Sequence, residues 1–111
     1  MNPHITPDDV LDLIRQTRAE MLRGPDYLQE AELASERAQE AAQVAFDKAF
    51  LGAEGSIPMR EAVAREVSSS ERDAAFIAKA VHNRVKSKMR ALEASLVSLQ
   101  AELKHMREDG A

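Results

Sequence analysis

A heptad pattern of apolar residues in the last third of the chain most constrains its fold. The apolar positions alternate steps of four and three residues, which is the spacing of a coiled-coil seam along one face of a helix. Seven residues form this leucine seam: Val85, Met89, Leu92, Leu96, Leu99, Leu103 and Met106. The seam predicts a long final helix that associates with other helices, and we expect it to form the interface of a homo-oligomer.

The composition favours an all-α fold. Charged residues make up 31% of the 111 residues and hydrophobic residues 44%, but aromatic residues make up only 4%. A chain rich in Ala, Leu, Glu and Arg favours long helices over a sheet, and few aromatic residues leave little bulk for a thick core. We therefore expect a single helical domain over residues 1–111 that oligomerisation completes.

Start and stop signals divide this domain into a long antiparallel helical hairpin, an additional N-terminal helix and a short connecting helix. Thr6 and Pro7 are typical of an N-cap and a first helical position. Gly24 and Pro25 predict a break between the first two helices. The four predicted helices cover residues 7–22, 26–51, 57–67 and 69–107.

The last two helices have start signals of their own. Ser56 precedes Pro58 at the start of the short helix, and Ser68 with Glu71 predicts a capping box that opens the last helix. Residues 74–81 are apolar on nearly every side, which predicts burial on several sides. All three phenylalanines are expected in the core: Phe46, Phe50 and Phe76.

The second predicted helix carries a seam of small residues. Its members again step by four and three: Tyr27, Ala31, Ala34, Ala38, Ala41 and Ala45. Alanine permits close approach of two helix backbones, so this seam predicts tight antiparallel packing against the early half of the last helix.

Charge and motif content exclude several classes of function. The chain has a formal net charge of −4 and no cysteine, which excludes thiolate chemistry and disulfides. No apolar run approaches the roughly 20 residues that span a bilayer, and the start lacks a signal-peptide pattern, so we expect a soluble, cytoplasmic protein. No nucleophile with a recognisable base and no metal-ligand spacing is evident. We expect a protein that is not an enzyme and needs no metal or cofactor.

A local basic run stands out against the acidic average. No Asp or Glu occurs between Ala74 and Leu92, but five basic residues do: Lys79, Arg84, Lys86, Lys88 and Arg90. At 100° per residue they lie on both flanks of the leucine seam. In one interpretation they contact nucleic-acid phosphates with little sequence preference. In the other they form ion pairs with the acidic second helix, through Glu32, Glu36 and Glu40.

The chain also resembles small helical proteins of tailed phages, and most of all the UvsY-type recombination mediators. The resemblance covers residues 27–107 and rests on the segment AFLGAEGS at residues 49–56, on Arg60 with Glu61, and on the long final helix that reads KAVHNRVKSKMRALEASLVSLQAELKHMR. It implies an oligomeric, non-enzymatic accessory protein that binds single-stranded DNA, weakens the hold of single-strand-binding protein and helps to load a RecA-like recombinase. The five basic residues would then contact phosphates, and the leucine seam would assemble the oligomer.

Two alternatives need no DNA contact. The first is a helical protein–protein interaction module, such as a phage-encoded adaptor or inhibitor that presents its acidic helix or leucine seam to a host protein. The second is a scaffold of virion assembly, for which the seam is the only support. Accessibility of the basic residues distinguishes the first alternative from the DNA-binding interpretation.

Overall fold

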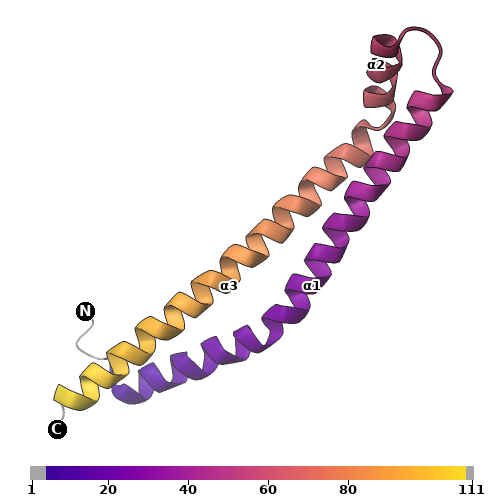
Figure 1. Cartoon of the computed structure of the whole chain (residues 1–111). Helices are drawn as coiled ribbons and strands as arrows, with labels where there is room; N and C mark the ends of the chain where they lie inside the picture. Colours follow the sequence, from indigo (N-terminus) through magenta and orange to yellow (C-terminus); the bar gives the residue numbers. More distant parts are fainter. Residues whose placement is uncertain (1–4, 110–111) are drawn as a thin grey trace. The chain divides into compact units, whose positions relative to one another are not determined.

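The computed structural model describes residues 5–109, and all of its regular elements are helices (Figure 1). These are α1 (Pro7–Gly52), α2 (Ile57–Val67) and α3 (Ser69–Asp109). No strand occurs in this described part of the chain, so the all-α fold class is confirmed. The outermost residues of the predicted domain, 1–4 and 110–111, lie outside the described range.

Contacts divide the chain into two compact units, and each takes residues from both long helices. Unit 1 joins the residues up to Tyr27 to those from Val85 onward, and unit 2 is Leu28–Arg84. Within each unit a segment of α1 lies antiparallel to a segment of α3, which is the predicted hairpin arrangement. The single domain over residues 1–111 stays a prediction.

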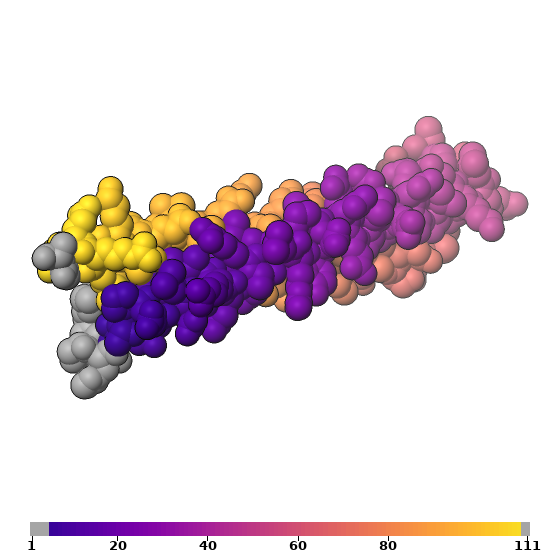
Figure 2. Space-filling model, turned by 90° about the horizontal axis from the view of Figure 1, so that it is seen from below, coloured from indigo at the N-terminus to yellow at the C-terminus, as the bar shows by residue number. Residues whose placement is uncertain are grey.

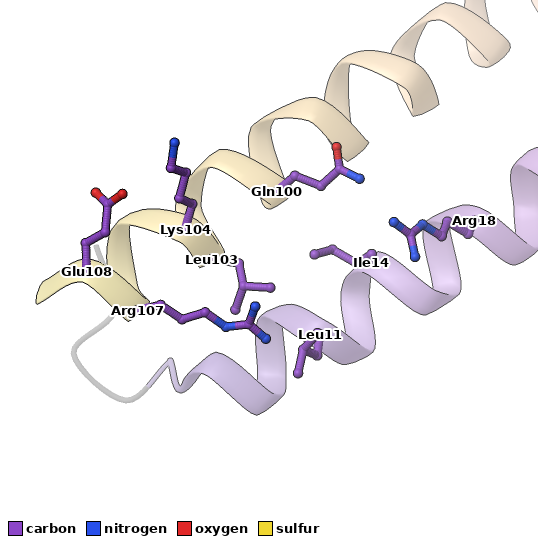
Figure 3. Close-up of a pocket in the computed structure, with 8 residues that line it drawn as sticks. All are labelled: Leu11, Ile14, Arg18, Gln100, Leu103, Lys104, Arg107 and Glu108. Carbon is purple, nitrogen blue, oxygen red and sulfur yellow. The ribbon is translucent and has the colours of Figure 1, made fainter. Parts of the chain in front are cut away.

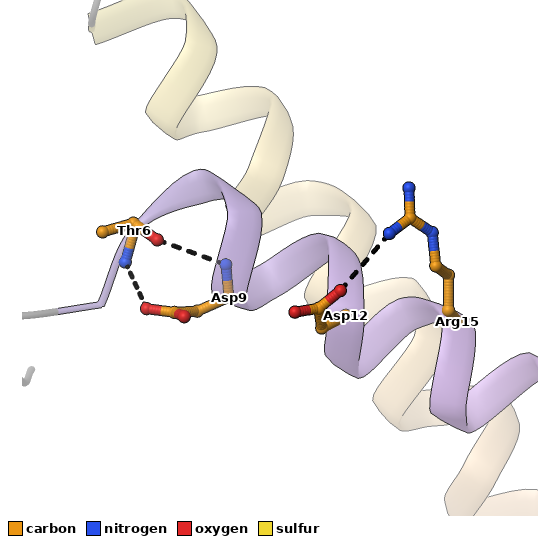
Figure 4. Close-up of polar contacts among 4 residues, drawn as sticks. All are labelled: Thr6, Asp9, Asp12 and Arg15. Atoms are coloured by element: carbon orange, nitrogen blue, oxygen red, sulfur yellow. Dashed lines mark hydrogen bonds and ion pairs between the residues drawn. The ribbon is translucent and has the colours of Figure 1, made fainter.

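The start of α1 follows its predicted cap. The amide of Asp9 donates to the Thr6 hydroxyl over 3.2 Å, and the amide of Thr6 donates to the Asp9 carboxylate over 2.9 Å (Figure 4). This reciprocal pair satisfies amides that have no partner within the helix. One turn later Arg15 forms an exposed ion pair with Asp12 at 3.3 Å.

The predicted break at Gly24 and Pro25 is wrong, because α1 is continuous from Pro7 to Gly52 with Pro25 inside it. A residue before proline is normally driven out of the helical region by a clash that involves its Cβ, and Gly24 has none. Gly24 is also buried, and a Cβ there would overlap the thioether of Met89 on α3. The glycine therefore allows close packing of two helices within unit 1 and does not end α1.

Unit 1 has a core of large apolar side chains. Val10, Ile14 and Leu103 form a buried cluster, and Val10 is only 1% exposed. Seam residues Leu96, Leu99 and Met106 pack against that cluster, with Ile5 and Leu11 beside them. Figure 2 shows the start of α1 lying against the C-terminal part of α3. Much of the leucine seam is thus used for packing within the chain, and its role in an oligomer stays a prediction.

Unit 2 packs small side chains in its interior, in a register that differs from the predicted one. Ala31, Ser35 and Ala42 of α1 are buried, whereas Ala34 and Ala41 are exposed. The same register turns three large residues of α1, Leu28, Phe46 and Phe50, partly inward. Burial of their apolar surface stabilises this register over one centred on alanines alone.

One arginine stabilises the connection between α1 and α2. Arg60 of α2 donates through Nε to the Phe50 carbonyl over 3.1 Å, and its guanidinium lies 4.5 Å from the centre of the Phe50 ring. Gly55 has φ +107°, which other residues rarely adopt. Ser56 then caps α2 by accepting a hydrogen bond from the Met59 amide over 3.4 Å. This start of α2 confirms the prediction.

The junction of α2 and α3 differs from the predicted capping box. The Ser68 hydroxyl donates to the Ala64 carbonyl over 2.6 Å, and both residues are 0% exposed. Ser68 therefore closes α2, and the Arg72 amide bonds to its backbone carbonyl over 3.0 Å at the start of α3. The predicted helix boundaries on either side are correct.

The predicted burial of residues 74–81 is wrong. Phe76 is 76% exposed, Ile77 is 62% exposed and Val81 is 44% exposed. The inner side of α3 in this segment is formed by the half-buried Ala75 and Ala78. The small residues of this segment thus face the interior of unit 2, and its large apolar residues face outward.

Candidate nucleic-acid interface

The five predicted phosphate-contacting residues all lie on α3 but belong to different units. Lys86, Lys88 and Arg90 are in unit 1, and Lys79 and Arg84 are in unit 2. Lys86 is half-buried and the other four are exposed. A lysine can bury its aliphatic stem on apolar surface and keep its ammonium group in water, so Lys86 remains able to meet an anion.

None of these five cations has an acidic partner among residues 5–109. The ion pairs in that range are Arg15–Asp12, Arg65–Glu61 and His105–Asp109, and each joins residues of one helix. Within unit 2, Lys79 and Arg84 form no ion pair with Glu32, Glu36 or Glu40, and all three glutamates are exposed. The predicted ion pairs between the basic residues and these glutamates are therefore absent from the described residues of unit 2.

Unit 1 contains a second group of cations beside a shallow groove. The groove has a volume of about 460 Å³ and lies between α1 and α3. Leu11, Ile14 and Leu103 give it an apolar floor. The side chains that surround this floor are polar: Arg18, Gln100, Lys104, Arg107 and Glu108.

The arginines of this groove come from opposite helices. In Figure 3 the Arg107 side chain extends from α3 toward α1, and Arg18 lies along α1 on the other side of the groove. Sequence reasoning missed this group, since Arg18 and Arg107 border one groove only through the antiparallel register of the two helices. A clue was the basic last turn of α3, where cations favour the negative end of a helix dipole.

Unit 2 has a groove of its own with a different lining. It measures about 530 Å³ and is bordered by Arg65 and Arg72, by the amides of Gln39 and Gln43, and by small or aromatic residues of the helix pair. Arg65 also lies 4.0 Å from Glu61, so its charge is partly compensated. The groove offers hydrogen-bond donors but no acid and base pair for catalysis.

Of the three phenylalanines predicted to lie in the core, two are partly buried and one is exposed. Phe46 and Phe50 are half-buried, with ring centres 6.4 Å apart and planes inclined by 13°. Phe76 is exposed rather than in the core, and Tyr27 is 56% exposed. Among residues 5–109, two aromatic rings are therefore exposed, one in each unit.

Comparison with protein-family models, with curated proteins and with solved structures found no match. Within residues 5–109, no cluster of three or more His, Cys, Asp or Glu side chains is arranged to hold a metal ion. In the same range, no helix has an apolar stretch long enough to cross a membrane. A cytoplasmic location stays a prediction.

Proposed function

We propose that this protein is a non-enzymatic accessory protein of phage type that binds single-stranded DNA through the basic residues of α3. One observation carries the proposal: Lys88 and Arg90 are exposed, and like Lys86 they take part in none of the ion pairs among residues 5–109. Cations that are free of ion pairs remain available to an external anion, and nucleic-acid phosphates are bound by lysine and arginine in this way.

The expected binding mode follows from the residue types. Lysine and arginine on one helix contact phosphates without reading bases, so we expect little sequence preference. Three cations bind weakly at physiological salt, and the net charge of −4 opposes binding elsewhere on the surface. Several copies on one strand would raise the apparent affinity, because later contacts become intramolecular. Assistance to a RecA-like recombinase is proposed from the resemblance of residues 27–107 to recombination mediators.

The test is fluorescence anisotropy of a labelled single-stranded oligonucleotide, titrated with protein over a range of salt concentrations. We expect binding that weakens as salt rises. In the triple variant Lys86→Ala, Lys88→Ala, Arg90→Ala, the log–log salt slope should fall by about 2, since each phosphate contact on a single strand contributes about 0.7.

A matched variant separates local contact from overall charge. Arg37, Lys48 and Arg65 are exposed cations of unit 2, and replacing all three by alanine changes the net charge by the same amount. This control should keep the parental salt slope. Equal loss in both triple variants, or parental binding by the α3 variant, would exclude the proposed interface.

A second candidate function is a protein–protein interaction module that never contacts DNA. It is favoured by the large apolar side chains exposed on unit 2, such as Leu51 and Phe76, each 76% exposed. A contiguous patch of exposed apolar side chains often marks a protein–protein interaction site. Absence of binding at low salt, in a sample shown to be folded, would favour this candidate.

A further inference from the structure

Unit 2 buries small side chains and leaves many of its large apolar side chains exposed. Its buried residues are alanines and serines: Ala31, Ser35, Ala42, Ala64 and Ser68. Six large apolar residues of the same unit are at least 60% exposed: Leu51, Ile57, Met59, Val67, Phe76 and Ile77. A helix pair must bury an apolar face against another layer, and alanines provide little of that burial.

The outward side of α3 carries an apolar patch with a charge at each end. The patch consists of Phe76, Ile77, Ala80 and Val81, which are exposed and lie within about 140° of helix surface at 100° per residue. Asp73 and Arg84 fall on the same side, three residues before and three residues after the patch. Both are exposed, and neither is in an ion pair among residues 5–109.

We propose that a second copy of this chain covers the patch, with the two α3 segments antiparallel about a twofold axis between Ile77 and Ala80. Because Asp73 and Arg84 are equally distant from the patch centre, this pairing places Asp73 of each copy opposite Arg84 of the other. A parallel pairing would instead bring like charges together. The charge pattern therefore makes the patch self-complementary in one orientation.

The need for cover also favours a second copy over a different protein. The apolar residues of unit 2 are exposed whenever the chain folds, so their partner must be present at the same time and place as the chain itself. A second copy always meets that condition. The resulting four-helix layer would resemble bundles in which two helical hairpins bury a common core.

This inference does not rest on DNA binding, and it changes the role of one predicted residue. Arg84 pairs with Asp73 of the second copy and is no longer a phosphate contact. The phosphate-contacting residues proposed above, Lys86, Lys88 and Arg90, lie in unit 1 and are unaffected.

The test is a charge swap read by sedimentation equilibrium and light scattering without DNA. The parent should be a dimer. Asp73→Arg alone and Arg84→Asp alone each create two like-charge contacts per dimer, and each should weaken dimerisation about tenfold or more at low salt. The double variant Asp73→Arg, Arg84→Asp restores opposite charges and should return to near-parental affinity. Arg37→Asp, which makes the same change on exposed α1 surface of unit 2, should leave the dimer intact.

A second variant tests the apolar contact itself. Phe76→Ser with Ile77→Ser removes the largest exposed groups of the patch and should give a monomer with reduced helical circular dichroism, because unit 2 then lacks its second layer. A monomeric parent, a double charge swap that fails to restore the dimer, or a serine variant that dimerises like the parent would each overturn the inference.

Discussion

Units 1 and 2 share the long helices α1 and α3, and unit 2 also contains α2, but the two units bury opposite kinds of side chain. Unit 1 buries Val10, Ile14 and Leu103 at 1%, 4% and 8% exposure, with three further seam residues packed on them. Unit 2 buries only alanines and serines and exposes Phe76 and Ile77. A leucine-rich seam lets two helices form a core by themselves, whereas an alanine-rich seam brings helices close and leaves the larger residues for another partner.

A helical periodicity identifies a seam but does not identify the molecule that covers it. The leucine seam has the spacing of an oligomer interface, yet its C-terminal half packs against α1 of the same chain. The segment at residues 74–81, which has the composition of a core, is exposed. Oligomer surfaces in such chains are better sought where large apolar residues remain uncovered.

The largest expected effect is in the core of unit 1. Leu103→Ala removes a buried side chain from the cluster with Val10 and Ile14, and should lower the free energy of unfolding by about 2–4 kcal/mol. Val97→Ala, at a residue 66% exposed on the same helix, should change it by less than about 0.5 kcal/mol. Urea unfolding followed by circular dichroism measures both. Equal effects would show that the cluster does not stabilise unit 1.

An intermediate effect is expected in the seam of unit 2. Ala42→Leu inserts three carbons between closely packed helices and should cost about 1–3 kcal/mol. The neighbouring Ala41→Leu points outward and should be nearly neutral. Thermal unfolding of the two variants at equal concentration measures the difference. A larger loss for Ala41→Leu would restore the register predicted from the sequence.

The smallest effect concerns the close approach of α1 and α3 in unit 1. A Cβ at Gly24 meets only the flexible end of Met89, so that side chain can turn away at modest cost. Gly24→Ala should therefore be less favourable in the parent than in a Met89→Ala background, by about 0.5–1 kcal/mol. A double-mutant cycle from urea unfolding measures this coupling. Zero coupling would mean that the two residues do not touch.

Local signals predicted the helices well, and they failed where packing between helices decides the outcome. The caps at Thr6 and Ser56 form within a few residues, so the sequence predicted the starts of α1 and α2 correctly. The break at Gly24 and Pro25 was wrong because the absent Cβ serves a contact with Met89, about 65 residues away in the chain. The helix propensities of glycine and proline carry no information about such a contact.

The candidate site was predictable only in part for the same reason. The basic run on α3 is contiguous in sequence, and the exposure of four of its five members could be expected from their charge. The presence of Arg18 and Arg107 at one groove depends on the antiparallel register of two helices. The exposure of Phe76 depends on which side of α3 faces the alanines of α1. Neither the pair of groove arginines nor the exposure of Phe76 could be predicted without the structure.

Hydrogen exchange of the amides, measured at high and low protein concentration, tests the contrast between the two units most directly. Dissociation of a dimer held through unit 2 should speed exchange on dilution in Leu28–Arg84 and much less in the parts of α1 and α3 that form unit 1. Exchange independent of concentration throughout, or an equal increase in both units, would contradict the account.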